Sequence, residues 1–106
     1  RVREALSLSR VRVVGDPERR VCNIAALGGA GGGRVGEVPD GVDVFVAGDI
    51  GYHDAQGARE RGLALIGAGH EGTERPVLGV LKRFLAARFP ETPVSVYEEP
   101  ECFNLV

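Results

Sequence analysis

Apolar runs that end in glycine recur along this chain. Three of them are almost continuous in hydrophobic residues, a pattern typical of strands that are buried on both faces of a sheet. A glycine-rich segment closes each run and predicts a loop at that point. The three predicted strands are residues 21–27, 42–47 and 63–68.

Two shorter runs predict further strands, at residues 11–14 and 94–97. The segment Gly15-Asp16-Pro17-Glu18 is a turn signal, because proline fixes φ and aspartate can bond to the following backbone. We therefore expect strands 11–14 and 20–27 to form a hairpin. Residues 1–9, which precede these strands, are predicted to be the C-terminal end of a helix.

The clearest helical pattern follows the strand at 63–68. Thr73 is its predicted N-cap, Pro76 fits the first turn, and Pro90 ends the helix. A second helix is predicted over residues 53–61, with Gly62 as its C-terminal cap. The apolar residues of the long helix recur at intervals of three and four and form one stripe of Val77, Leu78, Leu81, Phe84, Leu85 and Phe89.

Strands that alternate with helical segments predict an α/β fold: a mixed, largely parallel sheet flanked by helices. Loops that follow parallel strands emerge at the same edge of the sheet, where ligands bind in open α/β folds. We therefore expect Gly28–Gly33, Asp49, His53, His70 and Glu74 to converge at one edge.

Composition narrows the class of protein. The 106 residues are enough for one domain with one core, and 43% are hydrophobic. A net charge of −2 without a basic stripe makes nucleic acid and anionic membranes unfavoured partners. No signal peptide or transmembrane run is evident. We expect a cytoplasmic protein in which Cys22 and Cys102 are reduced.

The chain has no methionine and opens at Arg1. We expect residues 1–106 to be one domain that is a fragment of a longer protein, so an active site inferred from them can be incomplete.

His70 and Glu74 are the leading candidates for metal ligands. They lie four residues apart where a strand gives way to a helix, and imidazole nitrogen and carboxylate oxygen each bind divalent metals at about 2.0–2.2 Å. The alternative is that Glu74 serves the positive helix N-terminus and His70 is an incidental loop residue.

Asp49 and His53 form a second pair with the same spacing. Asp49 can be a metal ligand or a carboxylate that supports one, and His53 can move protons near neutral pH. The alternative is that Asp49 caps the following helix and His53 lies on its solvated first turn.

The glycine loop formally matches GxGxxG over residues 31–36. A dinucleotide-binding motif should open a long helix, whereas Pro39 permits only a short helical turn around residues 34–38. Gly29 and Gly31 are more readily explained by close approach of the backbone to a cleft or to a neighbouring element, and anion binding by backbone N–H groups stays open.

Three segments together resemble a known family. Residues 25–31, 43–55 and 68–74 resemble, in order and spacing, the C-terminal half of the NIF-three-like dinuclear metal proteins, also called GTP cyclohydrolase I type 2 homologues. The resemblance extends over residues 8–97. It implies an α/β fold of which this chain is the C-terminal portion of a larger domain.

The resemblance also implies a site and partners. His70 and Glu74 match metal ligands of a centre that holds two divalent ions, with zinc, manganese, iron and nickel not distinguished. Asp49 and His53 match a segment that lines the cleft. Further ligands are expected from the N-terminal half, and the full-length chain is expected to form a homohexamer and to take a small phosphorylated or nucleotide-like ligand.

Two functional hypotheses follow. The first is a metal-dependent, hydrolase-like protein of unsettled substrate, with His53 as proton shuttle. The second is a non-catalytic module, stabilised by metal, that serves binding or assembly.

Overall fold

The computed structural model describes residues 1–100. Two compact units make up the chain: Arg1–Pro76, which holds the sheet, and a second unit that starts at Val77. The elements, in chain order, are α1 (Val2–Ala5), β1 (Arg12–Val14), β2 (Ile24–Leu27), the 3-10 helix η1 (Gly31–Glu37), β3 (Val44–Ala47), α2 (Tyr52–Glu60), β4 (Ala64–Gly67) and α3 (His70–Arg88).

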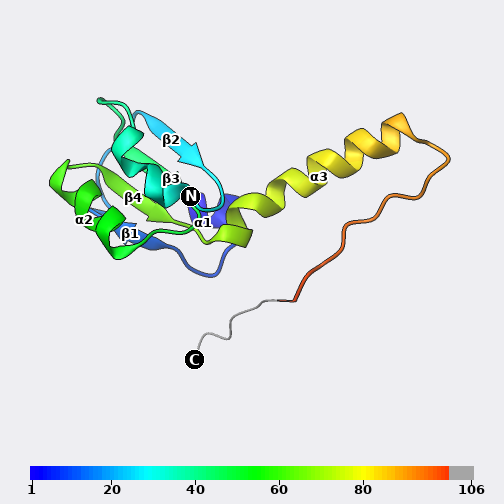
Figure 1. The fold of residues 1–106 in the computed structure, drawn as a ribbon, viewed down its shortest axis with the longest axis horizontal. Helices are drawn as coiled ribbons and strands as arrows, with labels where there is room; N and C mark the ends of the chain where they lie inside the picture. Colours follow the sequence, from blue (N-terminus) through cyan, green and yellow to red (C-terminus); the bar gives the residue numbers. More distant parts are fainter. Residues whose placement is uncertain (101–106) are drawn as a thin grey trace. The chain divides into compact units, whose positions relative to one another are not determined.

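The four strands form one mixed sheet in the order β1-β4-β3-β2 (Figure 1). Strand β3 pairs in parallel with β2 on one side and β4 on the other, and β1 runs antiparallel to β4. The predicted α/β class, with a mixed and largely parallel sheet flanked by helices, is confirmed.

The predicted hairpin of strands 11–14 and 20–27 is wrong, because β1 and β2 occupy opposite edges of the sheet. The turn itself forms, with the Glu18 N–H donating to Asp16 Oδ1 at 2.9 Å. The chain then continues across the sheet instead of reversing, and Arg19 anchors it by donating to the Gly62 carbonyl at 2.5 Å.

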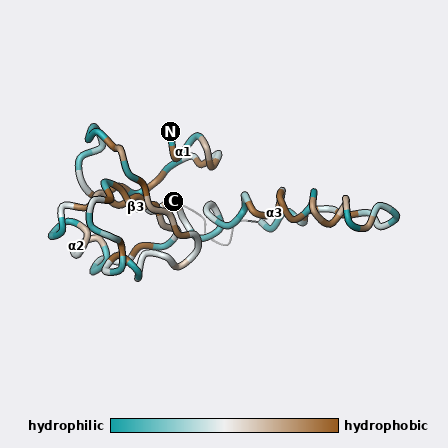
Figure 2. The backbone as a smooth tube through the Cα atoms, turned by 90° about the horizontal axis from the view of Figure 1, so that it is seen from above, coloured by the Kyte–Doolittle hydropathy of each residue, from teal (hydrophilic) through white to brown (hydrophobic). Residues whose placement is uncertain are grey.

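Strand β3 forms the centre of the core. All four of its residues are buried, and the tube through it is hydrophobic (Figure 2). Phe45 and Ala47 belong to a cluster with residues of η1 and α2, so these two helices cover one face of the sheet. A parallel strand between two others buries both of its faces, which explains its unbroken apolar sequence.

The opposite face of the sheet is less well covered. Val13 and Ile24 point to this side, and 46% and 62% of their surfaces are exposed. The connection from β1 to β2 crosses the face, where Asp16, Pro17 and Val21 border a hollow with Val13. Helices thus cover one face, and a loop crosses the other.

The helices agree with the sequence in kind and differ at their ends. Helix α2 is confirmed, and Gly62 follows it with a φ of +66°, as a C-terminal cap requires. Helix α3 ends at Arg88, before Pro90, but it begins at His70, so the predicted N-cap at Thr73 is wrong. The segment 1–9 is helical only over Val2–Ala5.

The predicted strand at 94–97 is wrong. The sheet formed by residues 1–100 takes its strands from Arg12 to Gly67, and a strand without a partner has no ladder to stabilise it. The predicted apolar stripe of α3 is present, but its members are exposed. In the described part of the chain, no helix is long and apolar enough to cross a membrane.

Candidate metal-binding cluster

The carboxyl ends of β2, β3 and β4 meet at one edge of the sheet, and backbone hydrogen bonds extend the ladder into their loops. The Asp49 N–H donates to the Gly29 carbonyl at 2.9 Å, and the Gly69 N–H donates to the Gly48 carbonyl at 3.0 Å. The three loops are therefore held together by their main chains. This confirms that the glycine loop, Asp49 and His70 converge.

Thr73 joins the first turn of α3 to the glycine loop. Its Oγ1 accepts a hydrogen bond from the Gly29 N–H at 2.9 Å. The same hydroxyl faces the carbonyl oxygens of Gly69 and His70, at 3.0 and 2.9 Å, as a donor. The sequence does not predict this role, because its only signal is a hydroxyl between the two predicted ligands.

His70 lies between two carboxylates. Its Nδ1 is 2.6 Å from Asp49 Oδ2, and its Nε2 is 3.3 Å from Glu74 Oε1. The side chains of Asp49, His70 and Glu74 are 61%, 51% and 59% exposed, so the cluster lies open at the surface.

The carboxylates change the acidity of the imidazole. The hydrogen bond that His70 donates to Asp49, followed by the negative charge of Glu74, raises the pKa of His70 above its ordinary value of 6.5. A metal ion that binds His70 therefore competes with a proton for the imidazole.

His70 and Glu74 have the spacing of two ligands to one ion. Ligands about 2.1 Å from a metal lie about 3.0 Å apart in octahedral and about 3.4 Å apart in tetrahedral geometry. The 3.3 Å between Nε2 and Oε1 falls within this range. Within residues 1–100, no group of three or more histidine, cysteine or acidic side chains is placed to hold a metal. The pair therefore fits part of a site.

Gly29 lies next to these two candidate ligand atoms. It is buried, its φ is +62°, and a Cβ built on it would lie 2.4 Å from Glu74 Oε1 and 3.3 Å from His70 Nε2. The absence of a side chain here lets the carboxylate rest against the loop.

The simpler explanations for Asp49 and Glu74 do not match the structure. Asp54, not Asp49, accepts the hydrogen bond from the Gly51 N–H at the start of α2, at 2.8 Å. Glu71 is the acidic residue in the first turn of α3, and Glu74 lies further along the helix. Asp49 and Glu74 direct their carboxylates to His70 instead.

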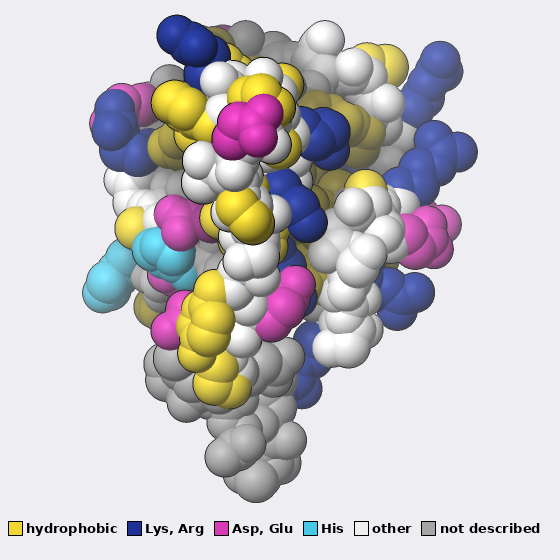
Figure 3. Space-filling view, turned by 90° about the vertical axis from the view of Figure 1, so that its right-hand side faces the viewer, with side chains coloured by type: hydrophobic (Ala, Val, Ile, Leu, Met, Phe, Trp, Pro, Cys, Tyr) yellow, Lys and Arg dark blue, Asp and Glu magenta, His cyan; other side chains and the backbone are white. Residues whose placement is uncertain are grey.

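His53 and Gly31 are not part of this hydrogen-bonded group. His53 is exposed on the first turn of α2, with its ring edge-on to Tyr52 at 5.7 Å between centroids. The space-filling view shows both histidines of the chain on one face, with acidic side chains beside them (Figure 3). Gly31 starts η1, where a Cβ would meet the Leu27 side chain at 2.9 Å.

The glycine loop folds into η1 and does not open a long helix. Two of its N–H groups are already bonded, Gly29 to Thr73 Oγ1 and Gly32 to the Asp49 carbonyl at 3.1 Å. These two donors serve the fold, and close backbone approach explains the glycines.

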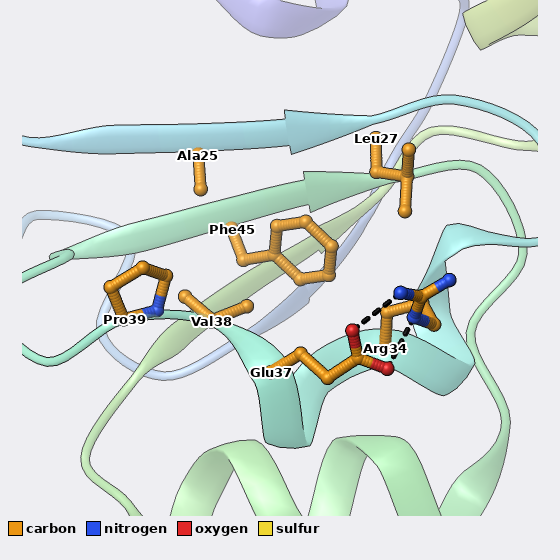
Figure 4. Close-up of a pocket in the computed structure, with 7 residues that line it drawn as sticks. All are labelled: Ala25, Leu27, Arg34, Glu37, Val38, Pro39 and Phe45. Carbon is orange, nitrogen blue, oxygen red and sulfur yellow. Dashed lines mark hydrogen bonds and ion pairs between the residues drawn. The ribbon is translucent and has the colours of Figure 1, made fainter.

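A separate hollow of about 270 Å³ lies between η1 and the strands β2 and β3 (Figure 4). The ion pair between Arg34 and Glu37 lies at its border, and each partner satisfies the charge of the other. The remaining lining is apolar, so this hollow offers a ligand fewer polar and ionisable groups than the His70 cluster does. Its lining residues are Ala25, Leu27, Arg34, Glu37, Val38, Pro39 and Phe45.

Comparison with known sequences gives a consistent result. A sequence model described as Duf34/NIF3 (NGG1p interacting factor 3) matches residues 1–101. A GTP cyclohydrolase 1 type 2 homolog of Staphylococcus aureus strain MSSA476 is 35% identical over 104 residues, which are 97% of this chain and 28% of that protein. A homolog of the same name from Clostridium acetobutylicum is 34% identical over 86 residues, covering 80% of this chain and 32% of its own.

Solved structures show the same fold. A Bacillus cereus protein related to NIF3 superimposes with a TM-score of 0.77 at 28% identity, over 98% of this chain and 30% of that one. A Staphylococcus aureus protein gives a TM-score of 0.73 at 37% identity, over 84% and 30% of the two chains. The chain thus spans less than a third of the length of these relatives.

Proposed function

Because the chain belongs to the Duf34/NIF3 family, we propose that it supplies His70 and Glu74 to a centre for two divalent metal ions. The observation that carries this proposal is the 3.3 Å between His70 Nε2 and Glu74 Oε1, with a bare glycine backbone beneath both atoms. Because the residues described supply two ligands, the remaining ligands come from outside them.

The proposed activity is a metal-dependent, hydrolase-like reaction of unsettled substrate. Divalent ions, when bound, supply Lewis acidity toward a water molecule and an oxygen-rich substrate such as a small phosphorylated or nucleotide-like compound. Glu74 and His70 orient the site from α3. His53 is the proposed proton shuttle, since its imidazole is exposed and an imidazole can both accept and release a proton.

The test is metal analysis of the protein expressed with its complete coding sequence. The His70→Ala/Glu74→Ala variant is expected to lose at least half of the divalent metal that co-purifies with the wild type, because two ligands leave the centre. The His53→Ala variant serves as a control, because His53 is proposed to move protons and not to bind the ions. Unchanged metal content in the double variant would refute the proposal.

A second candidate function is an assembly module that is stabilised by metal. The exposed stripe on α3 supports it, since contiguous apolar surface marks interaction sites. A homohexamer of the full-length, cytoplasmic protein would bury such surface. Retained assembly together with retained cellular function in the double variant would favour this candidate over the enzyme.

A further inference from the structure

We propose that Asp49 is the residue that positions His70, by holding Nδ1–H and so presenting the Nε2 lone pair beside Glu74. This inference rests on the proposed metal site and adds a residue to it that is not itself a ligand. Its first support is the 2.6 Å between Asp49 Oδ2 and His70 Nδ1, on the side of the ring opposite Glu74.

The two sides of the imidazole have different roles in this arrangement. In a neutral imidazole, one nitrogen carries the hydrogen and the other the lone pair. A carboxylate accepts hydrogen bonds only, so contact with Asp49 places the hydrogen on Nδ1. Nε2 is then the nitrogen that is free to bind a metal, and it is the one that lies 3.3 Å from Glu74 Oε1.

The main chain of Asp49 is fixed from both sides. Its N–H donates to the Gly29 carbonyl at 2.9 Å, and its carbonyl accepts from the Gly32 N–H at 3.1 Å. The next residue, Ile50, is 7% exposed and belongs to the core. The carboxylate therefore extends from a rigid base, as a group that orients a ligand should.

Asp49 does not cap the start of α2. Asp54 accepts the hydrogen bond from the Gly51 N–H there, at 2.8 Å. Asp49 and Asp54 therefore suit a matched comparison, because they are aspartates only five positions apart. Asp49 is exposed and bonds to the proposed ligand His70, whereas Asp54 is half-buried and bonds to the start of α2.

The experiment compares Asp49→Ala, Asp49→Asn and Asp54→Asn in the protein with its complete coding sequence. Zn²⁺ affinity is measured by competition with a chelating dye. The His70 tautomer is read from imidazole ¹⁵N shifts in the metal-free protein, at a pH high enough for the imidazole to be neutral. The His70→Ala variant assigns the His70 signals.

We expect wild-type His70 to carry its hydrogen on Nδ1 and Asp49→Ala to shift it toward Nε2. Both Asp49 variants should bind Zn²⁺ about 10–100-fold more weakly. Asp54→Asn should unfold more easily and keep wild-type affinity. Asn has nearly the size of Asp, so Asp49→Asn keeps the test valid if the alanine variant does not fold.

The outcomes separate the two proposals. Loss of Zn²⁺ in His70→Ala, with wild-type affinity and an unchanged tautomer in both Asp49 variants, would overturn the positioning role and leave the metal site standing. Full Zn²⁺ affinity in His70→Ala would overturn the metal site itself.

Discussion

At the scale of single residues, Gly29 shows how a missing side chain shapes the cluster. The residue has a φ of +62°, which L-residues adopt at a cost of about 1–2 kcal/mol. A methyl group here would also lie 2.4 Å from Glu74 Oε1. The carboxylate is the free end of a flexible side chain, so it would turn away and leave its place beside His70.

Gly29→Ala is therefore expected to cost about 1–2 kcal/mol of unfolding free energy and to weaken metal binding about tenfold or more. Gly69→Ala is the control, because Gly69 also has a positive φ, +80°, yet a Cβ there meets nothing within 4 Å. Denaturant unfolding and Zn²⁺ titration measure the two effects. Equal metal affinity in the two variants would contradict the steric explanation.

His70 gives the metal-free protein a pH dependence. Its folded-state pKa is raised above 6.5, so the folded state holds the proton more tightly than the unfolded chain does. This stabilising contribution is complete below about pH 6.5 and disappears as the pH rises through the folded-state pKa. The contribution is small, because solvent screens a half-exposed pair.

The midpoint of thermal unfolding of the metal-free protein should therefore fall more steeply than that of His70→Asn as the pH rises above about 6.5. Scanning calorimetry over a pH series measures both proteins. Parallel curves for the two would show that His70 gains no proton affinity on folding.

At the scale of elements, glycines let the three loops continue the sheet. A Cβ on Gly48 would lie 2.2 Å from the Gly29 carbonyl oxygen, and a Cβ on Gly32 would lie 2.1 Å from that of Asp49. Both obstacles are backbone atoms, which cannot rotate away. The close approach of these loops is what brings Asp49 to His70.

Gly48→Ala is accordingly expected to destabilise the protein by about 1–3 kcal/mol or more, with loss of metal binding. Gly57→Ala is the matched control inside α2, where a Cβ meets nothing within 4 Å. It should stabilise by about 0.5–1 kcal/mol, because alanine favours a helix. Urea unfolding measures both, and a neutral Gly48→Ala would contradict the packing of the loops.

The sequence was informative about elements and less so about their partners. The unbroken apolar run of β3 reflects the burial of that strand, and the spacing of apolar residues in α3 reflects helix geometry. Both are local signals, so the existence of both elements was predicted correctly. The position of β1 beside β4 depends on which edge of the sheet is free, and no local signal carries that information. Thr73 was misread for the same reason, since its partner, Gly29, lies 44 residues away.

The candidate site was predictable to a similar degree. Parallel strands imply that their following loops meet, and this rule predicts that Asp49 lies near His70, as the structure shows. The different roles of Asp49 and Asp54 were not predictable, because the sequence alone allows either carboxylate to cap the start of α2.

At the scale of the whole molecule, the cluster around His70 and the apolar stripe on α3 are both exposed. The cluster presents the two proposed ligand atoms to solvent, and the stripe on α3 is exposed from Val77 to Phe89. The relatives are more than three times as long as this chain. The proposed centre and the proposed assembly both draw on that additional length.

The half-covered sheet has a consequence for the life of the protein in a cell. Val13 and Ile24 leave apolar surface on the face that the β1–β2 connection crosses. A nascent chain that has completed these strands would offer that face to chaperones and to neighbouring polypeptides. The yield of native protein should then depend on how long this face stays exposed during synthesis, so that the rate of folding contributes to survival alongside thermodynamic stability.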